Sequence, residues 1–153
     1  MTTRWAFTAR AAALSVALIA AGCSSSPPEY TPPAGSLIAG TAQVTVNGQD
    51  IGTTDTVQCS EAGPLITIRT GDPNNPQASG ISALVAAADE LEVKEVGIRD
   101  LGGFTGSFNA GLGGEATVTM TGRTYTIDGT ADGFETANPS FRKSGTFEIK
   151  VAC

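Results

Sequence analysis

The chain has 153 residues, with fifteen acidic residues against nine basic ones and no histidine. This length suits one domain with a core of its own. The excess of carboxylates disfavours nucleic acid as a partner, because phosphate binding needs lysine and arginine. The lack of histidine removes Ser-His-Asp and Cys-His catalysis together with the commonest metal ligand. We therefore expect a protein that is not an enzyme, with no catalytic residues, metal site or cofactor.

The first 22 residues have the layout of a secretory signal peptide. A basic start precedes a short apolar run from Ala11 to Ala21, and small residues lead into Cys23, as is typical of such signals. The run is too short for a good transmembrane span, which needs about 20 residues. A cysteine at the cleavage point resembles the bacterial lipobox, which predicts cleavage before Cys23 and a diacylglycerol on its thiol, with palmitate among the acyl chains. The alternative is an ordinary signal with an incidental cysteine, since Ala20 stands where the lipobox usually has leucine.

The segment from Cys23 to Gly40 is rich in proline and serine, and we predict that it is a disordered tether. Its seventeen residues after the cysteine would reach roughly 50 Å at about 3.1 Å each. Cleavage would leave seven basic against fifteen acidic residues, a charge that anionic lipid headgroups repel. The lipid anchor, and no basic patch, is therefore expected to hold the protein at the extracytoplasmic face of the cell membrane.

Two cysteines remain if Cys23 is acylated. In an oxidising exported compartment, Cys59 and Cys153 are expected to form a disulfide. A redox or metal-binding pair is the alternative, but the sequence has no CxxC spacing and no cluster of further ligands.

Short strands are predicted from Thr41 onward. Val44 and Val46 alternate with polar residues before Asn47-Gly48, which is a strong signal for a tight turn. Residues 53–59 are predicted as the returning strand, and 65–70 as a third strand before a loop rich in glycine, proline and asparagine.

One helix is predicted after that loop. Ile81, Leu84, Val85 and Ala88 follow the spacing i, i+3, i+4 and i+7 of an apolar helical stripe. The alanines around them favour helix, and Asn75 before a proline is a candidate cap. We expect this helix to begin near Ser79 and to pack its stripe on the sheet.

Strands are predicted again after the helix. They cover residues 92–99, 104–108, 116–121, the residues around Tyr125 and Ile127, and 147–152. Asp132-Gly133 and Asn138-Pro139 are expected to bracket a long loop. Residues 41–153 are therefore expected to form one α+β domain, with a mostly antiparallel sheet of about seven to eight short strands, one packed helix and one disulfide.

One possible ligand site emerges from this pattern. Phe104 and Phe108 flank Gly106 on one face of a strand, and the missing side chain would leave an apolar slot beneath the residues Ile81, Leu84 and Val85. Ordinary core packing is the alternative. The carboxylates of Asp128, Asp132 and Glu135 do not follow the spacing of an EF-hand, so turn chemistry explains them better than calcium.

Several motifs, in a fixed order, resemble the mycobacterial 19 kDa lipoprotein antigen family (LpqH-like). They are Cys-Ser-Ser, Val-x-Val-Asn-Gly, Val-Gln-Cys, Val93-Lys94-Glu95-Val96-Gly97, Tyr125-x-Ile127-x-Gly129-Thr130-Ala131, Ala137-Asn138-Pro139 and Phe147-Glu148-Ile149-Lys150-Val151-Ala152-Cys153. The resemblance implies a secreted envelope lipoprotein with a disulfide at the positions of Cys59 and Cys153. It also implies a surface antigen, an adhesin-like role, and agonism of host Toll-like receptor 2 through the acylated N-terminus.

These observations favour a non-enzymatic, membrane-anchored surface lipoprotein that engages host receptors through its acyl chains. The alternative hypothesis is a carrier or binding module for a hydrophobic ligand of the envelope. The slot around Gly106 motivates this alternative, and the resemblance also suggests ligand transport.

Overall fold

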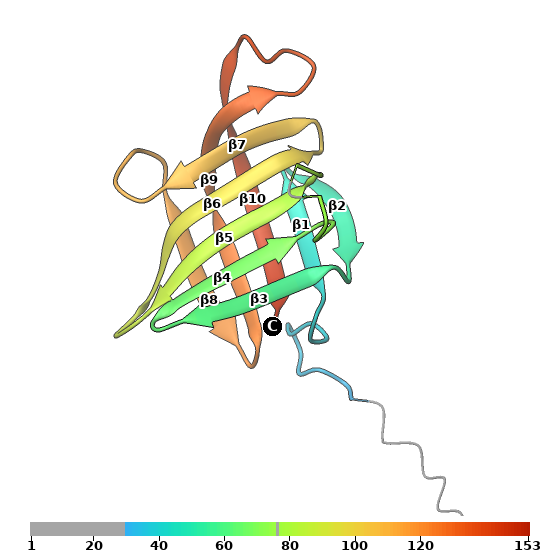
Figure 1. Ribbon diagram of the computed structural model, residues 1–153, viewed down its shortest axis with the longest axis vertical. Helices are drawn as coiled ribbons and strands as arrows, with labels where there is room; N and C mark the ends of the chain where they lie inside the picture. Colours follow the sequence, from blue (N-terminus) through green and yellow to red (C-terminus); the bar gives the residue numbers. More distant parts are fainter. Residues whose placement is uncertain (1–29, 76) are drawn as a thin grey trace, which may run out of the picture.

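The computed structural model describes residues 30–75 and 77–153, which form ten antiparallel strands (Figure 1). The strands are β1 (Ala42–Val46), β2 (Gln49–Thr54), β3 (Val57–Ala62), β4 (Leu65–Thr70), β5 (Gly80–Ala87), β6 (Leu91–Leu101), β7 (Phe104–Asn109), β8 (Ala116–Thr121), β9 (Thr124–Glu135) and β10 (Arg142–Ala152). No helix occurs in this described part of the chain. Accordingly, none of its segments is a helix long and apolar enough to cross a bilayer.

A single sheet contains all ten strands and curls strongly. Its order is β2-β1-β10-β9-β7-β6-β5-β4-β3. The long strand β9 pairs with β8 along its first half and with β7 along its second half. Strands β3 to β7 cross in front of β1, β9 and β10 in Figure 1. The two outermost strands, β2 and β3, are consecutive in the chain and are joined by only two residues, 55 and 56. The sheet therefore bends back on itself and nearly closes.

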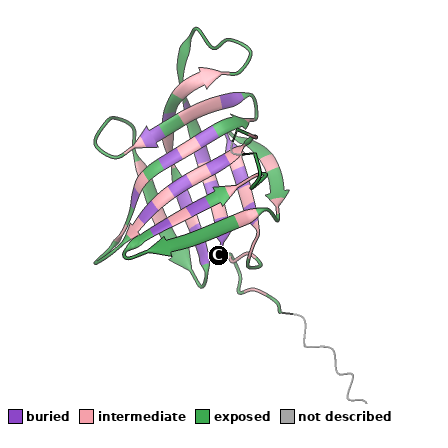
Figure 2. Ribbon diagram, viewed as in Figure 1, coloured by how far each residue is buried: buried purple, intermediate pink, exposed green. Residues whose placement is uncertain are grey.

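The core lies inside this curl and follows a period of two residues. Along β1, buried residues alternate with half-buried ones, and β10 repeats this alternation over its last residues. Figure 2 shows the same alternation as stripes across β4 to β7. Several inward side chains are fully buried, among them Ile68, Ile127, Ile149 and Val151. Since successive side chains point to opposite faces of a strand, the other residues face outward and can form a surface site.

The predicted helix is wrong, because this segment forms strand β5. Ile81, Ala83 and Val85 are buried, and Leu84 lies between them on the opposite face. Ile81 and Val85 share a face under either periodicity, so the apolar spacing alone could not separate helix from strand. Strands β4 and β6 supply ladder hydrogen bonds on both sides. This pairing with the preceding and the following strand overrides the helix preference of the alanines. The predicted α+β class therefore becomes all-β, with ten strands.

Two boundaries also differ from the prediction. The turn at Asn47 and Gly48 is confirmed, with φ angles of 52° and 77°, as a type I′ hairpin requires. The returning strand, however, is β2, and residues 57–62 form the separate strand β3. The predicted loop beginning at Asp132 is instead the end of β9, which pairs there with both β7 and β10. The strands 65–70 and 116–121 have the predicted bounds.

The predicted disulfide is present. It joins Cys59 on the edge strand β3 to Cys153 just after β10, with the two Cα atoms 5.8 Å apart. These strands are far apart in the sheet order. The bond therefore links one edge of the sheet to its opposite wall and holds the curl together.

Candidate functional site

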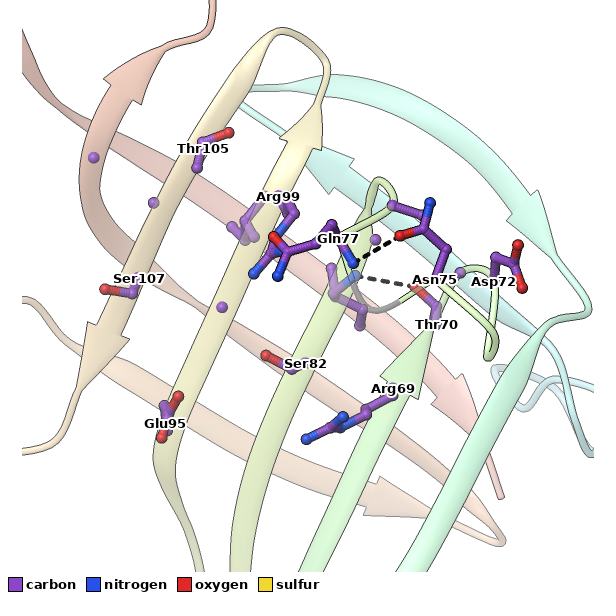
Figure 3. A pocket seen from close by; sticks show the side chains of 18 of the residues that line it. Arg69, Thr70, Asp72, Asn75, Gln77, Ser82, Glu95, Arg99, Thr105 and Ser107 are labelled. Carbon is purple, nitrogen blue, oxygen red and sulfur yellow. Dashed lines mark hydrogen bonds between the residues drawn. The ribbon is translucent and has the colours of Figure 1, made fainter. Parts of the chain in front are cut away.

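A polar groove of ≈ 830 Å³ lies on the outer face of the sheet (Figure 3). It begins at Gln58 on β3, crosses strands β4 to β7 and continues to β9 and the start of β10. The loop between β4 and β5 forms one of its walls. Most of its lining residues are charged, hydroxylated, amide-bearing or glycine.

The floor of the groove is a row of residues that face one another across neighbouring strands. Arg69 pairs with Ser82, Ser82 with Gly97, Gly97 with Ser107, and Ser107 with Asp132. Each of them alternates along its strand with a buried residue, which directs it outward. The groove therefore runs across the strands, and small residues occupy the middle of its floor.

Hydrogen bonds of the described loop residues, 71–75 and 77–79, hold the first wall. The Asn75 side-chain oxygen accepts from the backbone N–H of Gln77 at 3.1 Å, and the Asp72 carboxylate accepts from the N–H of Asn74 at 2.8 Å. Arg99 reaches the wall from β6 and donates from Nη1 to Gln77 Oε1 at 2.6 Å (Figure 3). The loop and the strand β6 are thus tied together.

The other end of the groove is built by β9 and β10. The hydroxyl of Ser144 donates to the Asp132 carboxylate at 2.6 Å. Next to this pair, Arg142 of β10 lies opposite Phe134 of β9, and both residues line the groove. An arginine and a carboxylate therefore stand at this end as well.

The charges of the groove are balanced. Its lining contains three arginines and three acidic residues, which are Arg69, Arg99, Arg142, Asp72, Glu95 and Asp132. Elsewhere on the described chain, the three ion pairs all use lysine, at positions 94, 143 and 150. Arg123 is the fourth arginine of the described residues and lies in the turn between β8 and β9. The arginines are therefore concentrated in the groove, while lysines neutralise carboxylates outside it.

The predicted apolar slot stays a prediction, and the structure divides its residues. Phe104, Phe108, Ile81 and Val85 are buried in the core, whereas Leu84 faces the outside. A Cβ at Gly106 would lie 2.7 Å from two ring atoms of Phe104. The ring of Phe104 thus occupies the space that the missing side chain leaves. Of the six residues, Ile81 and Gly106 line the polar groove.

The three carboxylates considered for calcium have separate neighbours. Asp128 lies opposite Glu148 on β10, and burial, followed by this like charge, raises the pKa of Asp128 above its usual range. A hydrogen bond from Lys143 lowers the pKa of Glu135. No group of three residues suited to hold a metal ion occurs among the residues that the structure describes.

Sequence reasoning missed the groove, because its residues come from seven strands that are brought together only by pairing. The available signal was weak: Ser82, Gly97 and Ser107 are small residues that alternate with apolar ones. The predicted lipidation site, Cys23, lies outside the described residues.

Comparison with known proteins identifies relatives over the folded part of the chain and beyond. The model of the family "Mycobacterium 19 kDa lipoprotein antigen" matches residues 35–153. A "Putative lipoprotein" of Mycobacterium indicus pranii is 37% identical over 146 residues, which is 95% of this chain and 96% of the relative. "Lipoprotein LpqH" of Mycobacterium tuberculosis is 36% identical over 112 residues, covering 72% of this chain and 68% of the relative. "Lipoprotein LpqH" of Mycobacterium avium is 34% identical over 112 residues, or 72% and 67% of the two chains. The chain therefore belongs to the Mycobacterium 19 kDa lipoprotein antigen family.

Proposed function

We propose that this protein is a non-enzymatic surface lipoprotein, anchored at the extracytoplasmic face of the cell membrane through acylation of Cys23. Membership of a lipoprotein antigen family supports the anchoring, and the basic, apolar and small-residue pattern before Cys23 supports its position. Two buried acyl chains make a stable anchor, since each methylene adds about 0.8 kcal/mol. The folded domain then serves as an antigen displayed on the cell surface, with an adhesin-like role.

One structural observation carries this proposal. Residues 36–40, at the C-terminal end of the predicted tether, are fastened to the sheet by hydrogen bonds at three successive points. The Ser36 hydroxyl donates to the Thr121 carbonyl at 3.0 Å. The N–H of Leu37 donates to Thr124 Oγ1 at 2.9 Å, and the N–H of Gly40 donates to the Ala152 carbonyl at 2.8 Å. The predicted tether therefore joins the domain beside Thr121 of β8, Thr124 of β9 and Ala152 of β10.

The position of this attachment point decides which end of the domain can extend farthest from the membrane. Ser36 comes thirteen positions after Cys23, and a chain of that length reaches at most about 45 Å. The loop between β9 and β10 lies at the opposite end of the molecule from the described segment that precedes β1, drawn in blue (Figure 1). Phe141 in this loop has 74% of its surface exposed. The proposal therefore has this loop facing outward from the cell, where antibodies and host molecules reach it.

Agonism of Toll-like receptor 2 is the finer part of the proposal, and it belongs to the acylated N-terminus rather than to the sheet. The groove and the core are not required for it, because the receptor would engage the acyl chains on Cys23. A soluble domain without acyl chains is therefore expected to be inactive on reporter cells for this receptor.

Labelling with an alkyne analogue of palmitate in a mycobacterial host tests the anchor. Wild-type protein is expected to carry the label and to fractionate with membranes. A Cys23→Ala variant should be unlabelled, and its purified form should lose activity on receptor reporter cells. Preserved circular dichroism and the absence of free thiols at Cys59 and Cys153 control for folding. Label retained by Cys23→Ala would contradict anchoring at this residue, and full receptor activity of the unlabelled variant would contradict agonism through acyl chains.

A further inference from the structure

We propose that the groove on the outer face of β4 to β7 binds a linear, uncharged oligosaccharide that lies across the strands. This inference goes beyond the proposed function, since it requires neither the lipid anchor nor a host receptor.

The balance of hydrogen-bond donors and acceptors points to a ligand rich in hydroxyl groups. Each guanidinium presents five donors and no acceptor, whereas an ionised carboxylate only accepts. The groove offers both kinds of partner. Arg69 on β4 lies near one end and Arg142 on β10 near the other, and the carboxylates of Glu95 on β6 and Asp132 on β9 also line the groove. A sugar hydroxyl donates and accepts at once, so it can use both kinds of partner. Planar side chains of these types also pair with two neighbouring hydroxyls at a time.

The same lining disfavours other classes of ligand. A polyanion would meet three carboxylates, and a polycation would meet three arginines. An apolar ligand would remove these charges from water without giving them hydrogen bonds, which is costly. A neutral polar ligand avoids all three penalties.

The shape of the groove indicates an elongated ligand. The floor runs from Arg69 on β4 to Asp132 on β9 through the register pairs of β5, β6 and β7. Four strand spacings of about 4.8 Å give a length of roughly 19 Å. This is the span of a short oligosaccharide rather than of a single sugar. Phe134 lines the far end, and the electron-rich face of an aromatic ring attracts the C–H groups of a sugar.

Glycine at position 97 keeps the middle of the floor open. A Cβ there would lie 2.7 Å from Ser82 Oγ, and no other heavy atom lies within 4 Å. Rotation of the serine hydroxyl can relieve this contact. The backbone of Gly97 is also not among those with positive φ, so a larger side chain is compatible with the strand. Gly97→Val should therefore obstruct the groove while leaving the sheet intact.

Isothermal titration calorimetry tests the proposal on the acylated full chain in a detergent without a sugar headgroup. The probes are maltohexaose, cellohexaose and mannohexaose, each also tested as its monosaccharide, with dextran sulfate as the polyanion. Arg69→Gln and Arg142→Gln remove one guanidinium at each end. Arg123→Gln is the matched control, because it removes an arginine from the turn between β8 and β9, outside the groove.

At least one hexasaccharide is expected to bind, and to bind more tightly than its monosaccharide. Arg69→Gln and Arg142→Gln should each weaken binding by about tenfold, the scale of a hydrogen bond to a charged group. Gly97→Val should abolish binding with an unchanged unfolding temperature, and Arg123→Gln should leave the affinity as it is. The proposal is overturned if none of the hexasaccharides binds, if dextran sulfate binds more tightly than all of them, or if Arg123→Gln weakens binding as much as the groove variants.

Discussion

Replacing both Cys59 and Cys153 with serine is expected to lower the free energy of unfolding by about 4 kcal/mol. The two cysteines are 94 positions apart in the sequence. In the chain-entropy model, cross-linking a loop of that size restricts the unfolded chain by up to about 4.7 kcal/mol at 25 °C. With a dependence of about 2 kcal/mol per molar urea, the unfolding midpoint should fall by roughly 2 M.

The structure indicates that the loss of the disulfide should destabilise strand β3 first. Within residues 30–75 and 77–153, strand β3 pairs only with β4, and five of its six residues are exposed. Without the bond to Cys153, little besides this single ladder holds β3 to the curled sheet. Hydrogen exchange of its amides is therefore expected to accelerate more than that of β9, which lies between β10 on one side and β7 and β8 on the other.

Urea unfolding followed by circular dichroism, together with hydrogen exchange, measures both effects. Reduced wild-type protein provides the control, because dithiothreitol should bring it to the stability of the double variant and leave the variant unchanged. A midpoint shift below about 0.5 M, or exchange that accelerates equally in β3 and β9, would refute the role assigned to this bond.

Three further variants test other parts of the fold. Gly133→Ala should destabilise the protein by more than about 2 kcal/mol, because its Cβ would lie 2.0 Å from a backbone oxygen of β7. Urea unfolding measures this loss, with Gly97→Ala as the control. Equal stability of the two variants would contradict the prediction. Asn47→Ala should lower the free energy of unfolding by about 1–2 kcal/mol. Asn47 has a φ of 52°, and its side-chain oxygen accepts a hydrogen bond from the backbone N–H of Thr146 on β10 at 3.0 Å. An unchanged unfolding temperature would count against this prediction. Burial and the charge of Glu148 raise the pKa of Asp128 in the folded state. The Asp128 side chain therefore contributes most to stability below its unfolded-state pKa of about 3.8, and this contribution is lost as the pH rises through the folded-state pKa. Asp128→Asn should thus stabilise the protein at pH 7, by less than about 0.5 kcal/mol after solvent screening. At pH 3 the variant should be no more stable than the wild type in urea unfolding. A variant that is less stable than the wild type at pH 7 would contradict this prediction.

Local patterns were sufficient wherever turn chemistry bounded a strand with one apolar face. Leu65–Thr70 and Ala116–Thr121 have the bounds that the sequence predicts, because glycine-containing turns separate each from its neighbour. Local patterns failed for β5, since Ile81 and Val85 satisfy both a helical and an extended periodicity. They also failed at Asp132, where turn-forming residues continue a strand that is paired on both sides.

The sequence alone determined the family, the pairing of Cys59 with Cys153 and most of the strands, because these depend on residue identity, order and short-range periodicity. Only the tertiary structure decided that β5 is a strand and that Arg69, Gly97 and Arg142 share one groove. Both outcomes depend on the register between paired strands, across the sheet from β4 to β10. Register arises from burying many apolar side chains together in one curled sheet, and no single segment carries that information.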